Sequence, residues 1–164
     1  MKLRKSALSA LLAAAGTVIL ALGSLWGRID LAAAVLASVC VAVAAEETDA
    51  GHALAVYAVI AVLALLLLPQ KTAAVLFTAF FGYYPVLKAA SERRLGVLGA
   101  YLAKFSAMNL ALAGLLIAAC FAVKVHIFVM LCAFAVCNVL LPLYDFAVTR
   151  VTLVYRARRF RGGK

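Results

Sequence analysis

Lys104 and Asp145 are the charged residues best placed to do chemistry in this chain. Each stands at the edge of a long apolar run, and the two carry opposite charges. If both runs are antiparallel membrane helices, the two side chains lie at a similar depth. A charge inside a bilayer costs several kcal/mol unless it is paired or solvated. We therefore expect the two residues to pair, either as the charged floor of a polar pocket or as side chains that snorkel to the interface.

Four uncharged polar side chains are expected in the same layer. Tyr83 and Tyr84 precede Pro85, which removes a backbone donor and is expected to kink its helix near Gly82. The other two lie a turn or two deeper than the charged pair, and both need hydrogen-bond partners in lipid: Asn109 and Asn138. The candidate pocket thus comprises Tyr83, Tyr84, Lys104, Asn109, Asn138 and Asp145. An interfacial aromatic belt and polar contacts between helices are the alternative interpretation.

Catalysis and metal binding are not expected. The motifs GxSxG, HExxH and GKS/GKT do not occur, and the four cysteines form no CxxC pair. Each cysteine lies in an apolar run, where a thiol behaves as a small hydrophobic group. The two histidines, His52 and His126, are expected at opposite membrane faces. The sequence thus predicts a protein that is not an enzyme and holds no cofactor.

Composition identifies the elements that must position these residues. Of 164 residues, 68% are apolar and 13% are charged, and mean hydropathy is +1.13. Soluble domains are about 45–50% apolar and about 25% charged, which excludes that class. A span needs about 20 apolar residues, so the chain has room for six and for no further domain. We predict an all-α transmembrane bundle with spans at 6–27, 31–45, 50–70, 72–87, 105–123 and 125–144.

Three alternatives to these spans remain open. The fifth run can begin near Leu95, because only Lys104 interrupts it. The second and third runs can form a re-entrant hairpin instead of two crossings. The first run can be a secretory signal, although it is longer than the apolar core of about 7–15 residues that such signals have.

The basic residues predict the orientation. With six spans, the segments on the side of the N-terminus hold twelve Lys and Arg residues, against three in the opposite connections, Arg28, Lys71 and Lys124. Lys and Arg collect in cytoplasmic segments, so both termini are expected in the cytoplasm. The acidic turn at 46–49 falls on the same side. Carboxylates contribute little to orientation, so this turn does not change the prediction.

A basic segment closes the chain. We expect a membrane domain over 1–150 and a cytoplasmic tail over 151–164. Pro142 is expected to break the last span, so that the chain bends there and continues as a basic interfacial helix. Such a segment attracts anionic lipid at about 1 kcal/mol per basic residue. The expected lipid contacts are Arg156, Arg158, Arg159 and Arg161. A simple topology anchor is the alternative.

Ala10 and Ala14 form a small-xxx-small pair in the first run, a spacing that lets two helix backbones approach closely in lipid. The segment 5–14 (KSALSALLAA) resembles the first helix of energy-coupling-factor (ECF) transporter S-components. Those are six-helix bacterial subunits that bind a vitamin or metal ion and join a transmembrane coupling subunit. The resemblance implies that Ala10 and Ala14 contact such a partner. It departs from the family in one respect: S-components bind ligand toward the outer face, whereas the polar residues here gather toward the inner one.

The sequence therefore predicts a multi-pass protein of the cell membrane, most simply the bacterial inner membrane. Its function is expected to be that of a substrate-binding or accessory subunit of a transporter. The alternative is a non-catalytic scaffold or cell-envelope accessory protein that acts through helix–helix contacts. Expected partners are the bilayer and another membrane protein at the first helix. Nucleic acid is not expected, because no soluble basic face exists to carry it, and the substrate is not identified.

Overall fold

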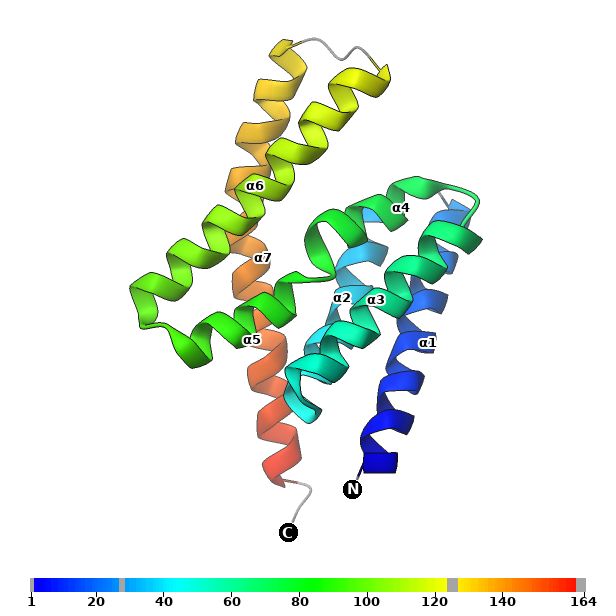
Figure 1. Ribbon diagram of the computed structural model, residues 1–164, viewed down its shortest axis with the longest axis vertical. Helices are drawn as coiled ribbons and strands as arrows, with labels where there is room; N and C mark the ends of the chain where they lie inside the picture. Colours follow the sequence, from blue (N-terminus) through cyan, green and yellow to red (C-terminus); the bar gives the residue numbers. More distant parts are fainter. Residues whose placement is uncertain (1, 27–28, 124–126, 162–164) are drawn as a thin grey trace.

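The described part of the chain consists of helices joined by short connections, with no strands. A computed structural model describes residues 2–26, 29–123 and 127–161. Its helices are α1 (Lys2–Trp26), α2 (Asp30–Glu47), α3 (Ala50–Leu67), α4 (Lys71–Leu76), the π-helical η1 (Phe77–Phe81), α5 (Tyr84–Arg94), α6 (Val97–Val123) and α7 (Ile127–Arg161). The chain runs up and down between two ends, so that α1 begins and α7 finishes at the same end (Figure 1). We call this the terminal end.

Alanine packing builds the body of the molecule, α1–α4. Half of the residues of α2 are buried, nine of eighteen, and six of those nine are alanines. Small side chains let helix backbones approach closely, which is how helices associate in lipid. Gly23 of α1 shows the limit of this packing, because a Cβ there would collide with the Cβ of Ala33. The core of the body is therefore close-packed.

The fourth predicted span is one broken helix. α4 passes into η1, whose π-helical turn ends at Gly82, and α5 then begins with Pro85 in its first turn. A Cβ on Gly82 would lie 2.6 Å from the Tyr57 ring, so only glycine allows that ring to pack here. Proline fits the first turn of a helix because the backbone N–H groups of that turn have no partner within the helix. The N–H that proline lacks is therefore not missed. The break expected near Gly82 is confirmed.

α6 and α7 form a long hairpin that leans away from the body (Figure 1). α6 begins at Val97, as the earlier of the two predicted starts allows. The expected break at Pro142 is wrong, since α7 continues through it to Arg161 as one helix. Tyr144 and Asp145 bond to other helices directly after the proline, and these contacts hold the chain helical. The predicted boundary between 150 and 151 thus falls inside α7.

Five helical segments are long and apolar enough to cross a membrane: Leu3–Trp26, Ala50–Leu67, Lys71–Glu92, Leu98–Ile117 and Phe134–Ala157. The second predicted span corresponds to α2, which is not among these five segments and carries three carboxylates, Asp30, Glu46 and Glu47. Those carboxylates stand at its two ends, and the stretch between them is uncharged. Arg28 and Lys124, expected in connections at the other end, lie outside the described residues.

Candidate functional site

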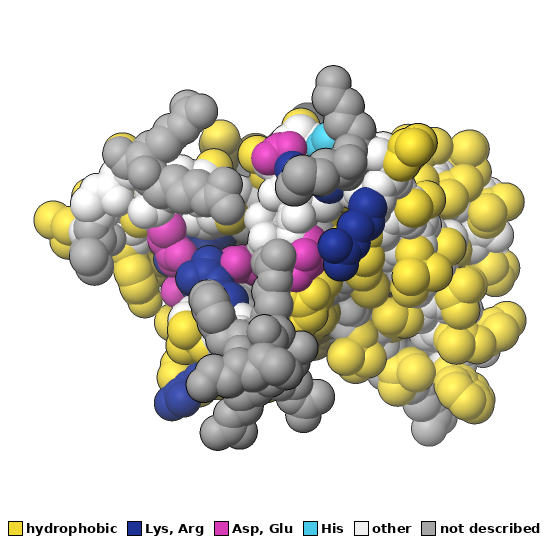
Figure 2. Space-filling view, turned by 90° about the horizontal axis from the view of Figure 1, so that it is seen from below, with side chains coloured by type: hydrophobic (Ala, Val, Ile, Leu, Met, Phe, Trp, Pro, Cys, Tyr) yellow, Lys and Arg dark blue, Asp and Glu magenta, His cyan; other side chains and the backbone are white. Residues whose placement is uncertain are grey.

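Charged side chains gather at the terminal end of the molecule. Seen from below, Lys, Arg, Asp and Glu side chains cross this face together, while apolar side chains cover the flank beside it (Figure 2). Helices α2, α5, α6 and α7 all contribute to the charged contacts at this end. The candidate site is built from these residues.

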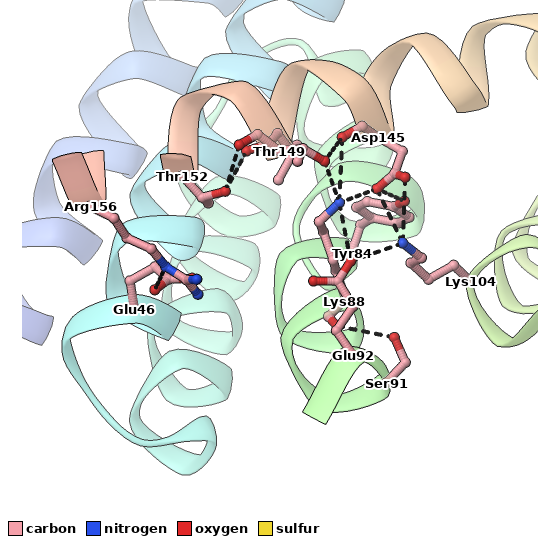
Figure 3. A network of polar contacts seen from close by, with 11 residues as sticks. Glu46, Tyr84, Lys88, Ser91, Glu92, Lys104, Asp145, Thr149, Thr152 and Arg156 are labelled. Atoms are coloured by element: carbon pink, nitrogen blue, oxygen red, sulfur yellow. Dashed lines mark hydrogen bonds and ion pairs between the residues drawn. The ribbon is translucent and has the colours of Figure 1, made fainter. Parts of the chain in front are cut away.

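Asp145 of α7 is the centre of the cluster (Figure 3). Its carboxylate pairs with the ammonium group of Lys88 and lies 3.4 Å from that of Lys104. The hydroxyl of Tyr84 donates a hydrogen bond of 2.7 Å to the same carboxylate. The expected pairing of Lys104 with Asp145 is present, but Lys88 is the closer partner. Both lysines are 7% exposed, so each needs such a counter-charge.

Glu92 and Thr149 complete the cluster. Glu92 lies one turn after Lys88 on α5, 3.4 Å from that lysine and 3.1 Å from Lys104. The Lys88 ammonium also donates to the Thr149 hydroxyl at 2.6 Å. Two lysines thus face two carboxylates, and the cluster is neutral as a whole. It ties α5, α6 and α7 together at one point.

The acidic residues at the end of α2 and directly after it have partners of their own on α1 and α7. Arg156 donates two hydrogen bonds of 2.7 Å to the two oxygens of Glu46. The Tyr155 hydroxyl donates to Glu47 at 3.0 Å, and Lys5 pairs with Asp49 at 3.0 Å. The turn therefore joins the start of α1 to the end of α7. This explains why carboxylates stand among the basic residues of the terminal end.

A cavity of about 320 Å³ lies between Glu46–Arg156 and the Asp145 cluster. Helices α2, α5 and α7 form its walls, and Thr149 and Thr152 lie between the two sets of charges (Figure 3). Its charged lining consists of Glu46, Lys88, Glu92 and Arg156. The lining offers both signs of charge and two hydroxyls to one volume. It can hold a small polar ligand by hydrogen bonds at both ends.

Three of the six predicted pocket residues lie outside this cluster. Asn109 and Asn138 donate to carbonyls of their own helices, Phe105 and Phe134, each at 3.0 Å. Tyr83 donates its hydroxyl to the sulfur of Met108 at 3.4 Å. A short amide side chain finds the carbonyl one turn back more easily than a partner on another helix. Tyr84, Lys104 and Asp145 are the members that the structure brings together.

Lys88, Glu92 and Thr149 are the residues that the sequence analysis missed. Ending the fourth span at Leu87 placed Lys88 in a loop, whereas α5 continues to Arg94. A signal was available, because Lys88 and Glu92 have i,i+4 spacing, as do Asp145 and Thr149. Residues at that spacing share one face of a helix. Each helix thus presents a pair of polar groups to the other.

The predicted contact residues are exposed where the structure describes them. Ala10 and Ala14 lie on the exposed face of α1, away from the body. Arg156 is occupied by Glu46, and the side chains of Arg158, Arg159 and Arg161 lie outside the described residues. Among the described side chains, no group of three His, Cys, Asp or Glu residues could hold a metal ion.

Comparison with known proteins finds no relative of this chain. No family model, no curated protein and no solved structure matches the chain.

Proposed function

We propose that the chain is a membrane-embedded binding subunit that crosses the bilayer six times with both termini in the cytoplasm. Its ligand occupies the cavity between Glu46–Arg156 and the Asp145 cluster. The observation that carries the proposal is the lining of that cavity, where charges of both signs and two hydroxyls face one volume. A purely structural ion-pair network would not need that space. A binding subunit of a transporter is the function that this site supports best.

Two features support the six crossings. Five helices meet the requirement of length and apolarity, and α2 packs among them over the same height (Figure 1). The terminal end also holds Lys5, Lys88, Lys104 and Arg156, as the positive-inside rule requires of a cytoplasmic face. Single cysteines at Lys71 and at Lys5 test this. We expect an impermeant thiol reagent to label the former in intact cells and the latter only after lysis; the reverse would overturn the orientation.

Ligand binding is tested with two neighbouring residues of α7. Leu153 lines the cavity and Val154 does not, yet the two are equally exposed, at 53% and 54%. Leu153→Trp should obstruct the cavity, whereas Val154→Trp should not. Small molecules released from purified wild-type and variant proteins are compared by mass spectrometry. We expect one polar compound to be lost only with Leu153→Trp. No difference between the three proteins would contradict the proposed site.

A scaffold is the second candidate function, favoured by the exposure of Ala10 and Ala14. In this role α1 docks on another membrane protein, as the resemblance to S-components also implies. Changing both alanines to leucine should remove such a partner without affecting insertion. Ala55 and Ala58 of α3 are also exposed and provide the control pair. Pull-down from mild detergent separates the candidates: an ATPase with a membrane partner supports a transporter, and envelope-synthesis proteins support a scaffold.

A further inference from the structure

The break in the fourth span leaves two backbone carbonyls without the amide that an α-helix would provide. The amide of Gly82 would donate to Thr78 in an α-helix, but it donates to the Phe77 carbonyl instead, at 2.7 Å. Pro85 has no amide to donate to the carbonyl of Phe81. A bilayer offers such groups no water, so each carbonyl needs a donor from elsewhere in the protein.

Two tyrosine hydroxyls from neighbouring helices take the place of these amides. Tyr57 of α3 donates to the Thr78 carbonyl at 3.0 Å. The hydroxyl of Tyr144 on α7 lies 3.1 Å from the Phe81 carbonyl and 2.8 Å from the Ser38 hydroxyl of α2, so both acceptors share its proton. The backbone at the break is thus held by side chains of other helices. Irregular turns of this kind within a span often serve as hinges.

The break also separates two parts of the molecule that are fastened differently. The ion pair of Lys88 with Asp145 joins α5 to α7, so α5 and the hairpin form one unit. Toward the body, α5 presents the apolar side chains of Val86 and Ala89. Apolar contacts are not directional, whereas ion pairs and hydrogen bonds fix a geometry. α5 therefore follows the hairpin more readily than it follows the body.

A cavity lies on either side of Tyr144 along α7. An apolar cavity of about 280 Å³ lies between the body and the hairpin, and α7 lines it with residues between Cys137 and Ala147. α7 lines the polar cavity with residues between Val148 and Arg156. The layer that separates the cavities is packed, since Tyr144 and Val148 are both buried. Tyr144 is therefore a fixed contact with open space on both sides, the arrangement that a pivot needs.

Two contacts hold α7 to α2 on the terminal side of Tyr144. They are those of Arg156 with Glu46 and of Tyr155 with Glu47. The side chain of Arg156 is 57% exposed, so water competes for its ion pair. These contacts close the terminal side of the polar cavity, and they are easier to break than the buried pair between α5 and α7.

We propose that the fourth span is a hinge at Gly82, about which α5 and the α6–α7 hairpin swing as one unit with Tyr144 as the pivot. When the outer part of the hairpin moves toward the body, the apolar cavity narrows. On the other side of the pivot, Arg156 moves away from Glu46, and the polar cavity opens at the terminal end. The inference concerns a movement of the chain and holds whatever the polar cavity binds.

Distances between pairs of spin labels in the purified full-length protein in detergent measure the swing. The outer pair is Cys132 of α7 with Leu66→Cys of α3, and the terminal pair is Val154→Cys of α7 with Leu54→Cys of α3. All four positions are exposed, and the remaining cysteines are replaced by alanine. Along α7, Cys132 and Val154 lie about 18 and about 15 Å from Tyr144, on opposite sides. A swing of about 10° therefore moves both by about 3 Å, in opposite directions.

The variant that releases the terminal contacts combines Tyr155→Phe with Arg156→Gln. We expect it to bring the outer labels closer and to move the terminal labels apart, each by about 3 Å. Asp49→Asn is the matched control, because it breaks an ion pair with Lys5 at the same end but within the body. It should change neither distance.

A further variant locates the hinge. Pro85→Ala gives the Phe81 carbonyl a backbone donor and so stiffens the break. Added to the double variant, it should reduce both shifts at least about twofold, since a hinge absorbs the change in backbone angles.

Three outcomes would overturn the inference. Unchanged distances in the double variant would show that the hairpin does not swing. Lengthening of both distances would mean that the hairpin detaches from the body without a pivot at Tyr144. Equal shifts with and without Pro85→Ala would place the movement somewhere other than the break. The Leu153→Trp experiment decides separately whether the polar cavity binds a ligand.

Discussion

Different interactions hold the two regions of the molecule in place: close packing of small side chains in the body, and polar contacts in the α6–α7 hairpin. In the body, α1–α4 pack through alanines and glycines so closely that a single methyl group at Gly23 would collide with α2. In the hairpin, few described side chains are buried, and those of α7 are Tyr144 and Val148. The hairpin is held instead by ion pairs between Asp145 and α5, and by the contacts of Arg156 and Tyr144 with Glu46 and Ser38 of α2. A helix pair fastened at one end can lean away at the other, and the apolar cavity lies in the space that this leaves.

Removing the charge of Asp145 should have the largest effect on the free energy of unfolding. Asp145→Asn leaves the buried Lys88 and Lys104 with only Glu92 as a counter-charge. Breaking a buried pair costs about 3–5 kcal/mol, and we expect about 3 kcal/mol because Glu92 still reaches both lysines. The free energy of unfolding in detergent micelles measures it. A loss of less than about 1 kcal/mol would mean that water screens the cluster as it does at a surface.

Adding one methyl group should affect the two regions in opposite directions. Gly23→Ala overpacks the body and should cost about 1–3 kcal/mol. Gly114 of α6 has no neighbouring atom within 4 Å of an added Cβ. Gly114→Ala should therefore stabilise the hairpin by about 0.5–1 kcal/mol, because alanine is the better helix former. Thermal unfolding of the two variants compares them directly. A destabilising Gly114→Ala would indicate that the outer part of the hairpin is packed against something.

The exposed ion pair between Lys5 and Asp49 should contribute least to the free energy of unfolding. Asp49 is 71% exposed where it pairs with Lys5, and such pairs are worth about 0–1 kcal/mol. Asp49→Asn should therefore change the unfolding free energy by less than about 1 kcal/mol, and added salt should remove the difference. An effect as large as that of Asp145→Asn would show that ion pairs at this end act as one network.

Much of the fold follows from local properties of the sequence. Apolar runs predict the helices, and Gly82 with Pro85 predicts the break in the fourth span, because both are effects of the backbone itself. Pro142 was misjudged because contacts distant in sequence, from Tyr144 to Ser38 and from Asp145 to Tyr84, keep α7 helical beyond it.

The site was predictable only in part, for the same reason. The sequence predicts the pairing of Lys104 with Asp145, because the two carry opposite charges and the limits of the spans place them at a similar depth. Which lysine lies closer depends on where α5 ends and how it is rotated, and neither is encoded in hydropathy. The amide N–H groups of the two asparagines donate within their own helices, which periodicity cannot reveal.

The account depends most on the claim that Asp145 of α7 and Lys88 of α5 form a buried pair that fastens the hairpin to the fourth span. A double-mutant cycle with Asp145→Asn and Lys88→Met, measured as the free energy of unfolding in detergent, tests it most directly. We predict that the double variant is more stable than the sum of the single losses implies, by at least about 1 kcal/mol, because neither charge is then left unpaired. Additivity within about 0.5 kcal/mol would contradict the claim, since the two residues would then not depend on each other.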